Sequence, residues 1–135
     1  MLDHLRARLQ TEAIGDVELR QADILQLDAL ASDWSGYDLI VSASMLDYIP
    51  RERLAAALSA LRARLKPDGR FLLFITRNSW LMRPLIGRWW RSNLYGAAEV
   101  RAALDQAGFR DIAFHAFPSP YRYLDAWGHI AEAAA

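Results

Sequence analysis

The spacing of hydrophobic positions changes along the chain from helical to strand-like and back. Leucines at helical spacing, with arginines between them, predict an amphipathic helix over 2–13. The uninterrupted run Leu39-Ile40-Val41 predicts a strand over 37–43 that is buried on both faces. The same criteria predict further strands over 17–24, 70–77 and 110–117, and helices over 50–65 and 97–107. The tail, from Tyr123 onward, fits either a last strand or a helix.

This alternation of strands and helices is typical of an α/β fold. It predicts a three-layer domain with a mostly parallel sheet and helices on its faces. Right-handed crossovers would place the carboxyl ends of the strands at one edge, where ligands bind in such folds. The 135 residues suffice for one domain, which we assign to 1–135.

Composition narrows the function classes. The formal net charge is zero, which argues against a nucleic-acid binder. The sequence has no cysteine, so it has no disulfide and no thiolate metal site. Its three histidines show no ligand spacing, and we expect no metal. The N-terminus is unlike a signal peptide and no apolar run approaches the ~18 residues of a membrane span, so we expect a soluble cytoplasmic protein.

Three segments together resemble a known family. They are YDLIVSASMLDYI at 37–49, LKPDGRFLLF at 65–74 and AAEVRAALDQAGFRDIAF at 97–114. In this order they resemble the C-terminal portion of class I S-adenosylmethionine-dependent methyltransferases, and QADILQL at 21–27 is similar to the family's third strand. The resemblance implies a Rossmann-like fold with sheet order 3-2-1-4-5-7-6. It also implies methyl transfer from S-adenosylmethionine to a small or medium organic acceptor.

The sequence departs from the family pattern in the part that holds the cofactor. The family has a glycine-rich loop after its first strand, whereas no GxG occurs anywhere in this sequence. We therefore expect a truncated domain of about five strands, in which 17–24 pairs directly with 37–43. We expect weak cofactor binding by this chain alone and leave its activity open. An open edge on strand 37–43 would be a route to homodimers.

The resemblance assigns residues to the cofactor. Asp23 would accept a hydrogen bond from the adenine amino group, with Ile24 against the ring. Ser42, Ala43 and Ser44 would line the methionine end, because small residues let a ligand approach the backbone. The alternatives are that Asp23 caps the following turn and that the small residues only end the strand.

Two residues after this strand are candidates for catalysis. Methyl transfer relies mainly on positioning, so a base is optional. Asp47 or Tyr48 would orient or deprotonate the hydroxyl or amine of the acceptor. The alternative is an acid at a helix start beside a half-buried aromatic residue.

Segment 77–91 has an unusual composition, with four arginines, three tryptophans and no acid. By resemblance it would form a lid on the substrate pocket, and we assign substrate contacts to Trp80, Arg83, Trp89 and Tyr95. Packing on the core explains the pattern equally well, and contact with a membrane surface ranks third. A different function also remains, namely a non-catalytic α/β binding module that acts through the open sheet edge or through 77–91.

Overall fold

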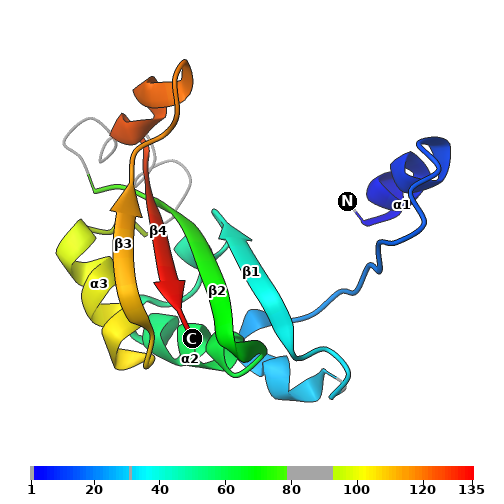
Figure 1. Ribbon diagram of the computed structural model, residues 1–135, viewed down its shortest axis with the longest axis horizontal. Helices are drawn as coiled ribbons and strands as arrows, with labels where there is room; N and C mark the ends of the chain where they lie inside the picture. Colours follow the sequence, from blue (N-terminus) through cyan, green and yellow to red (C-terminus); the bar gives the residue numbers. More distant parts are fainter. Residues whose placement is uncertain (1, 31, 79–92) are drawn as a thin grey trace.

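The computed structural model describes residues 2–30, 32–78 and 93–135. Its four strands form one sheet in the order β1-β2-β4-β3 (Figure 1). β1 is parallel to β2, whereas β4 is antiparallel to β2 and to β3. Three of the four strands therefore point the same way. The strands are β1 (Tyr37–Ala43), β2 (Leu65–Thr76), β3 (Arg110–His115) and β4 (Gly128–Ala134).

Two helices cover one face of this sheet, α2 (Leu54–Arg62) and α3 (Ala97–Gln106) (Figure 1). The period of two along β2 sends Phe71, Leu73 and Ile75 toward these helices, and all three are buried. Phe71 stacks on Phe109 with ring centroids 5.1 Å apart. The core is thus a single layer of side chains between the sheet and α2 and α3.

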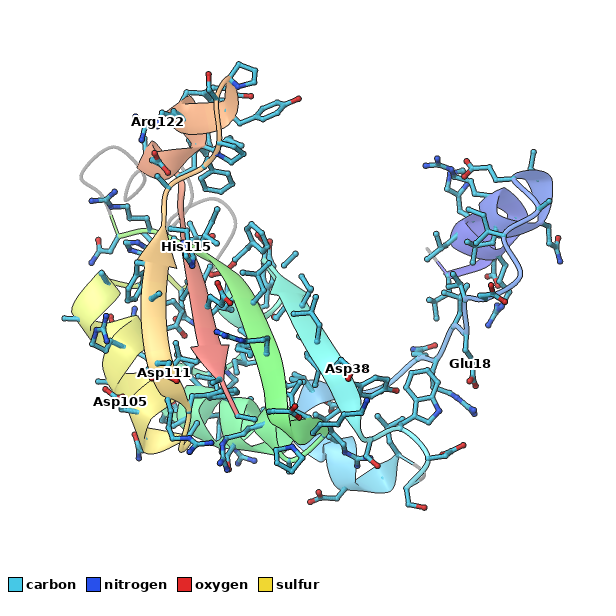
Figure 2. The ribbon with its side chains drawn as sticks, viewed as in Figure 1. Glu18, Asp38, Asp105, Asp111, His115 and Arg122 are labelled. Carbon is cyan, nitrogen blue, oxygen red and sulfur yellow. The ribbon has the colours of Figure 1, made fainter. Side chains whose placement is uncertain are left out.

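The opposite face of the sheet carries no helix among the described residues. Glu132 of β4 pairs there with Arg70 at 3.1 Å and with His115 at 2.9 Å. His115 is labelled in Figure 2. Leu39 and Val41 of β1 are each 53% exposed, so the prediction that strand 37–43 is buried on both faces is wrong. The described part of the chain therefore has two layers, and the expected third layer does not occur in it.

The predicted strand over 17–24 is wrong. This stretch is not in a strand, Val17 is exposed, and Asp23 instead caps the short 3-10 helix η1 (Ile24–Ala29). The predicted pairing of 17–24 with 37–43 is also wrong, and β1 is an edge strand. The alternating stretch contributes too few apolar side chains to hold a strand against β1. The sheet has four strands instead of about five.

The other elements follow the predictions with shifted ends. The first helix, α1, is Leu2–Thr11, buries no residue and lies apart from the sheet (Figure 1). The predicted helix over 50–65 is a 3-10 turn, η3 (Arg51–Arg53), followed by α2. The predicted stop at 66–69 is an irregularity within β2, where the pairing with β1 shifts register.

The ambiguous tail is a strand, β4, despite its alanines. Ala131 and Ala133 lie opposite Leu73 and Phe71 on the helix-facing side and are buried. Small side chains fit there because the large side chains of β2 and the helices already fill the layer. Tertiary packing therefore overrides the helical preference of alanine.

Candidate functional site

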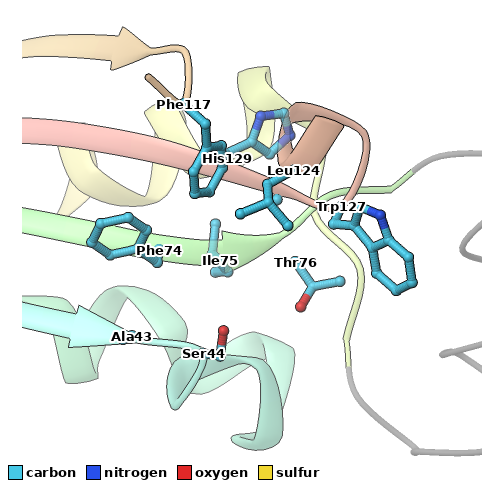
Figure 3. Close-up of a pocket in the computed structure, with 10 residues that line it drawn as sticks. Ala43, Ser44, Phe74, Ile75, Thr76, Phe117, Leu124, Trp127 and His129 are labelled. Carbon is cyan, nitrogen blue, oxygen red and sulfur yellow. The ribbon is translucent and has the colours of Figure 1, made fainter. Parts of the chain in front are cut away.

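A pocket of about 340 Å³ opens at the carboxyl ends of β1 and β2 (Figure 3). The pocket is mostly apolar, with a few polar groups at its base. Its lining comes from the ends of β1 and β2, the segment after β3, the 3-10 helix η5 (Tyr121–Ala126) and the start of β4. The lining residues are Ala43, Ser44, Phe74, Ile75, Thr76, Phe117, Leu124, Trp127, Gly128 and His129.

The floor of the pocket is built where β1 ends. Ser44 has a positive φ of 50°, and its N–H donates to the carbonyl of Phe74 at 2.9 Å. This sharp turn stops the strand and leads into the 3-10 helix η2 (Leu46–Tyr48). Small residues at 43 and 44 therefore leave the carboxyl edge of the sheet open.

Asp47 lies directly behind the pocket wall. It is only 1% exposed, and its carboxylate accepts two hydrogen bonds from Thr76, from N at 2.9 Å and from Oγ1 at 3.1 Å. Burial raises the pKa of Asp47, and the two bonds from Thr76 oppose this rise. Because Thr76 lines the pocket, its hydroxyl connects the pocket to a buried acid.

Tyr95 is buried in the core, below the carboxyl end of β2. The guanidinium of Arg51 lies 4.7 Å from the centre of its ring, and burial raises the pKa of its hydroxyl. That hydroxyl has no hydrogen-bond partner among the described residues. Tyr95 therefore packs the core beneath the pocket and is not part of the described lining.

His129 is a site residue that the sequence analysis missed. Its Nε2 lies 3.2 Å from the carbonyl oxygen of Tyr95. A carbonyl only accepts, so Nε2 carries the hydrogen and Nδ1 keeps its lone pair. Burial, followed by the charge of Arg77, lowers the pKa of His129, which favours the neutral ring. No spacing in the sequence could have shown that His129 belongs to the site, because Tyr95 and Arg77, which act on its ring, come from distant segments.

The roof of the pocket was also missed. Leu124 and Trp127 come from η5 and the residue after it. Asp125 fixes this roof, since its Oδ1 accepts from the N–H of Phe117 at 2.8 Å and its carbonyl accepts from Arg77 Nη1 at 3.0 Å. The N–H of Arg77 also donates to the carbonyl of Trp127 at 2.8 Å. In the sequence, the only sign of this roof was the turn that Pro118, Ser119 and Pro120 predict before it.

The structure brings some of the predicted cofactor residues to this pocket and separates others from it. Ala43 and Ser44 line it, whereas the Ser42 side chain is buried under the sheet. Asp23 accepts from the N–H of Leu25 at 2.9 Å and acts as a turn cap, and Ile24 packs against the core. Asp23 and Ile24 stand at the start of η1. Arg64 holds η1 near the amino end of β2, because its Nη2 donates to the Leu27 carbonyl.

The remaining predicted residues have different positions. Tyr48, in η2, is 62% exposed. Trp80, Arg83 and Trp89 lie outside the described residues, as does most of the predicted lid over 77–91.

Two classes of site do not occur in the described ranges. Residues 2–30, 32–78 and 93–135 contain no group of three His, Cys, Asp or Glu side chains that could hold a metal ion. None of the helices described there is long and apolar enough to cross a membrane.

A family model described as "Methyltransferase domain" matches residues 1–69. No curated protein sequence matches the chain. The chain is similar to solved structures of an S-adenosylmethionine-dependent methyltransferase, SibL, in its apo form (20% identity, TM-score 0.77), and of magnesium protoporphyrin IX methyltransferase from Synechocystis with bound SAH (19% identity, TM-score 0.65). It is also similar to a putative O-methyltransferase from Nostoc punctiforme (15% identity, TM-score 0.75).

These likenesses cover nearly all of this chain and only part of each relative. The matches cover 98%, 96% and 99% of this chain, in that order, but 40%, 57% and 41% of the other chains. At such identities they show the fold, which is the predicted Rossmann-like α/β fold. The observed order β1-β2-β4-β3 corresponds to the 4-5-7-6 part of the predicted sheet order.

Proposed function

Because the chain belongs to the methyltransferase domain family, we propose that it forms part of an enzyme that methylates a small organic acceptor. The observation that carries this proposal is the position of the pocket. It opens at the carboxyl ends of two parallel strands, where ligands bind in α/β folds of this kind. The absence of cysteine is in keeping with a cytoplasmic location, which we include in the proposal.

S-adenosylmethionine would supply an activated methyl group at this pocket. The described residues fit one end of such a cofactor, because Ala43 and Ser44 leave room beside the backbone at the carboxyl end of β1. Asp23 and Ile24, our candidates for adenine, belong with η1, which is tied to the amino end of β2. We therefore propose that this chain provides one wall of the cofactor site.

We propose that Asp47 serves as the base and acts through Thr76. An acceptor hydroxyl in the pocket would give its proton to Thr76 Oγ1 as the Thr76 proton passes to Asp47 Oδ2, 3.1 Å away. Burial, which raises the pKa of Asp47, makes this carboxylate a better proton acceptor than an exposed one. Tyr48 stands at the exposed end of the same turn and would contact the acceptor or cofactor from outside.

Calorimetric titration of the chain with S-adenosylhomocysteine tests the cofactor part. Saturable one-to-one binding supports the proposal, whereas no heat at millimolar ligand, with the chain shown to be folded, contradicts it for this chain. Substrate contacts by Trp80, Arg83, Trp89 and Tyr95 also remain proposals. Of these, Tyr95 would act from beneath the pocket, through the carbonyl that holds His129.

A second candidate function, that of a binding module, is favoured by the edge of β1. β1 is at the edge of the sheet and pairs only with β2 among the described strands. Leu39 and Val41 on this edge strand are each 53% exposed, so the strand offers an apolar surface for pairing. Antiparallel pairing of two copies centred on Ile40 would place Leu39 opposite Val41 of the partner subunit. It would also place Asp38 opposite an uncharged serine, so no like charges would meet.

Sedimentation equilibrium tests this homodimer. We expect dimers of the unmodified chain and monomers of Val41→Lys, because a lysine would place charge on the shared edge. Tyr123→Lys is the matched control, since it adds the same charge at another exposed apolar position. Monomers of the unmodified chain at all concentrations would contradict the homodimer.

A further inference from the structure

The lining of the pocket at the carboxyl ends of β1 and β2 is aromatic on several sides (Figure 3). Phe74 comes from β2, Phe117 from the segment after β3, and Trp127 from the roof. The rings of Phe74 and Phe117 are 6.2 Å apart between centroids and tilted by 50°. Offset and tilted rings of this kind leave faces and edges for another ring to contact.

The described lining offers no charged side chain to a ligand. Its polar groups are the hydroxyls of Ser44 and Thr76, the indole N–H of Trp127, and the imidazole of His129, whose Nε2–H is directed at a carbonyl. The nearest charged groups hold the roof in place, because Arg77 donates to the Asp125 carbonyl and the Asp125 carboxylate accepts from Phe117. A charged group placed between the rings of Phe74, Phe117 and Trp127 would lose its hydration without gaining a partner there.

The volume of the pocket and the hydroxyl of Thr76 set the size and the orientation of the ligand. The volume of about 340 Å³ lies at the lower end of the range for small-molecule pockets and suits one or two fused rings. Thr76 Oγ1 gives its hydrogen to Asp47, so its lone pairs remain to accept from a ligand hydroxyl. A ring held by the aromatic lining would therefore direct its hydroxyl toward Thr76.

From these observations we propose that the pocket binds an uncharged planar aromatic compound with a hydroxyl group, held by Phe74, Phe117 and Trp127 with the hydroxyl at Thr76. This inference rests on the proposed function in that the bound compound is the methyl acceptor. The binding itself requires no cofactor, so it is measured separately.

The probe pair 2-naphthol and 2-naphthoate separates ring binding from charge. Both contain the same two rings, and only the second is charged at pH 7. We expect equilibrium dialysis against the 135-residue chain, without cofactor, to show saturable binding of 2-naphthol. We expect binding of 2-naphthoate to be at least about tenfold weaker, since its carboxylate finds no cation in the lining. Equal binding of the two probes would overturn the proposal.

Two variants on one loop locate the binding. Trp127→Ala removes a wall and should weaken 2-naphthol binding about tenfold. Tyr123→Ala removes an equally aromatic side chain that is 65% exposed and outside the lining, and it should change nothing. Equal effects of the two variants would show adsorption to exposed rings and would overturn the site.

A variant that gains binding of 2-naphthoate cannot be explained by loss of structure. Leu124→Lys places a cation in the roof and should reverse the preference, so that 2-naphthoate binds more tightly than 2-naphthol. Loss of both probes in a folded Leu124→Lys chain would contradict the assignment of Leu124 to the roof. The titration with S-adenosylhomocysteine remains independent. Binding of 2-naphthol without binding of S-adenosylhomocysteine would support the aromatic site and contradict methyl transfer by this chain. Binding of S-adenosylhomocysteine without binding of 2-naphthol would contradict only the aromatic site.

Discussion

The β2-β4-β3 side of the sheet and the β1 side differ in how many of their strands are paired and in how much of their apolar surface is buried. On the β2-β4-β3 side the strands pair with one another, the helices cover one face, and a pocket is enclosed by five segments. On the β1 side the outer edge is unpaired, Leu39 and Val41 are exposed, and α1 and the stretch after it contribute no buried residue except Leu27 before β1 begins. The comparison shows that apolar sequence alone does not bury a strand. A strand on each side is needed as well, and among the described strands only β2 and β4 have one.

The largest difference is expected between two identical substitutions. Leu58→Ala creates a cavity at a fully buried position of α2 and should lower the free energy of unfolding by about 2–5 kcal/mol. Leu39→Ala on β1 should lower it by less than about 0.5 kcal/mol, because the side chain is mostly in solvent. Urea denaturation of the two variants measures both. Similar losses would show that the β1 side is covered in solution.

Asp47→Asn should have the next largest effect. Asparagine keeps an acceptor for the N–H of Thr76, but its amide nitrogen cannot accept the hydrogen of Thr76 Oγ1 as Asp47 Oδ2 does, so we expect a loss of about 1–3 kcal/mol near neutral pH. Thr76→Val is the control, since it keeps the backbone donor and removes only the hydroxyl. If Thr76→Val costs as much stability as Asp47→Asn, the backbone bond contributes little.

The pH dependence of the same pair gives a sharper test. Folding raises the pKa of Asp47 above its unfolded value of 3.8. Between the unfolded and the folded pKa, the folded chain therefore binds more protons than the unfolded chain. The contribution of Asp47 to stability is therefore full below pH 3.8 and falls as the pH rises through its folded pKa. The stability of the unmodified chain relative to Asp47→Asn should fall over this interval and then level off. A relative stability that rises with pH there would contradict the burial effect.

His129 should give a smaller dependence of the opposite sign. The folded state lowers its pKa below 6.5, so the unfolded chain binds more protons just below that pH. The contribution of a neutral His129 is present above pH 6.5 and is lost as the pH falls through the folded pKa. His129→Gln should remove this loss in thermal melts at successive pH values, and an unchanged profile would place the titration elsewhere.

The sequence was sufficient for the elements whose contacts are local or repeat with a clear period. The apolar runs at 37–43 and 70–77 and the helical period over 97–107 predicted the type of each element correctly, although β2 begins at Leu65 and β1 is not buried on both faces. Ala43 and Ser44 were assigned to the cofactor by the family resemblance and by their position at the end of the apolar run, and both line the pocket. The predicted strand at 17–24 was wrong. Alternation of apolar and polar residues shows which side chains could face a core, but it does not show that a core is present there.

The rest of the site depends on contacts between distant segments. Asp47 is singled out by Thr76, which is 29 positions away, and His129 by the carbonyl of Tyr95, which is 34 positions away. Leu124 and Trp127 become a roof only because Asp125 ties η5 to the ends of β2 and β3. Such links have no spacing rule, so the sequence could suggest Asp47 but neither its role behind Thr76 nor the aromatic wall.

The position of β4 has a consequence for synthesis of the protein. β4 is the latest of the four strands along the chain, yet it lies between β2 and β3 and pairs with both. While the chain leaves the ribosome, β2 and β3 are complete before the strand that joins them exists. The nascent chain must hold two open ladders apart from each other and from neighbouring chains until residues 128–134 emerge. Folding of this sheet therefore cannot finish before residues 128–134 have been synthesised, however early β2 and β3 are complete.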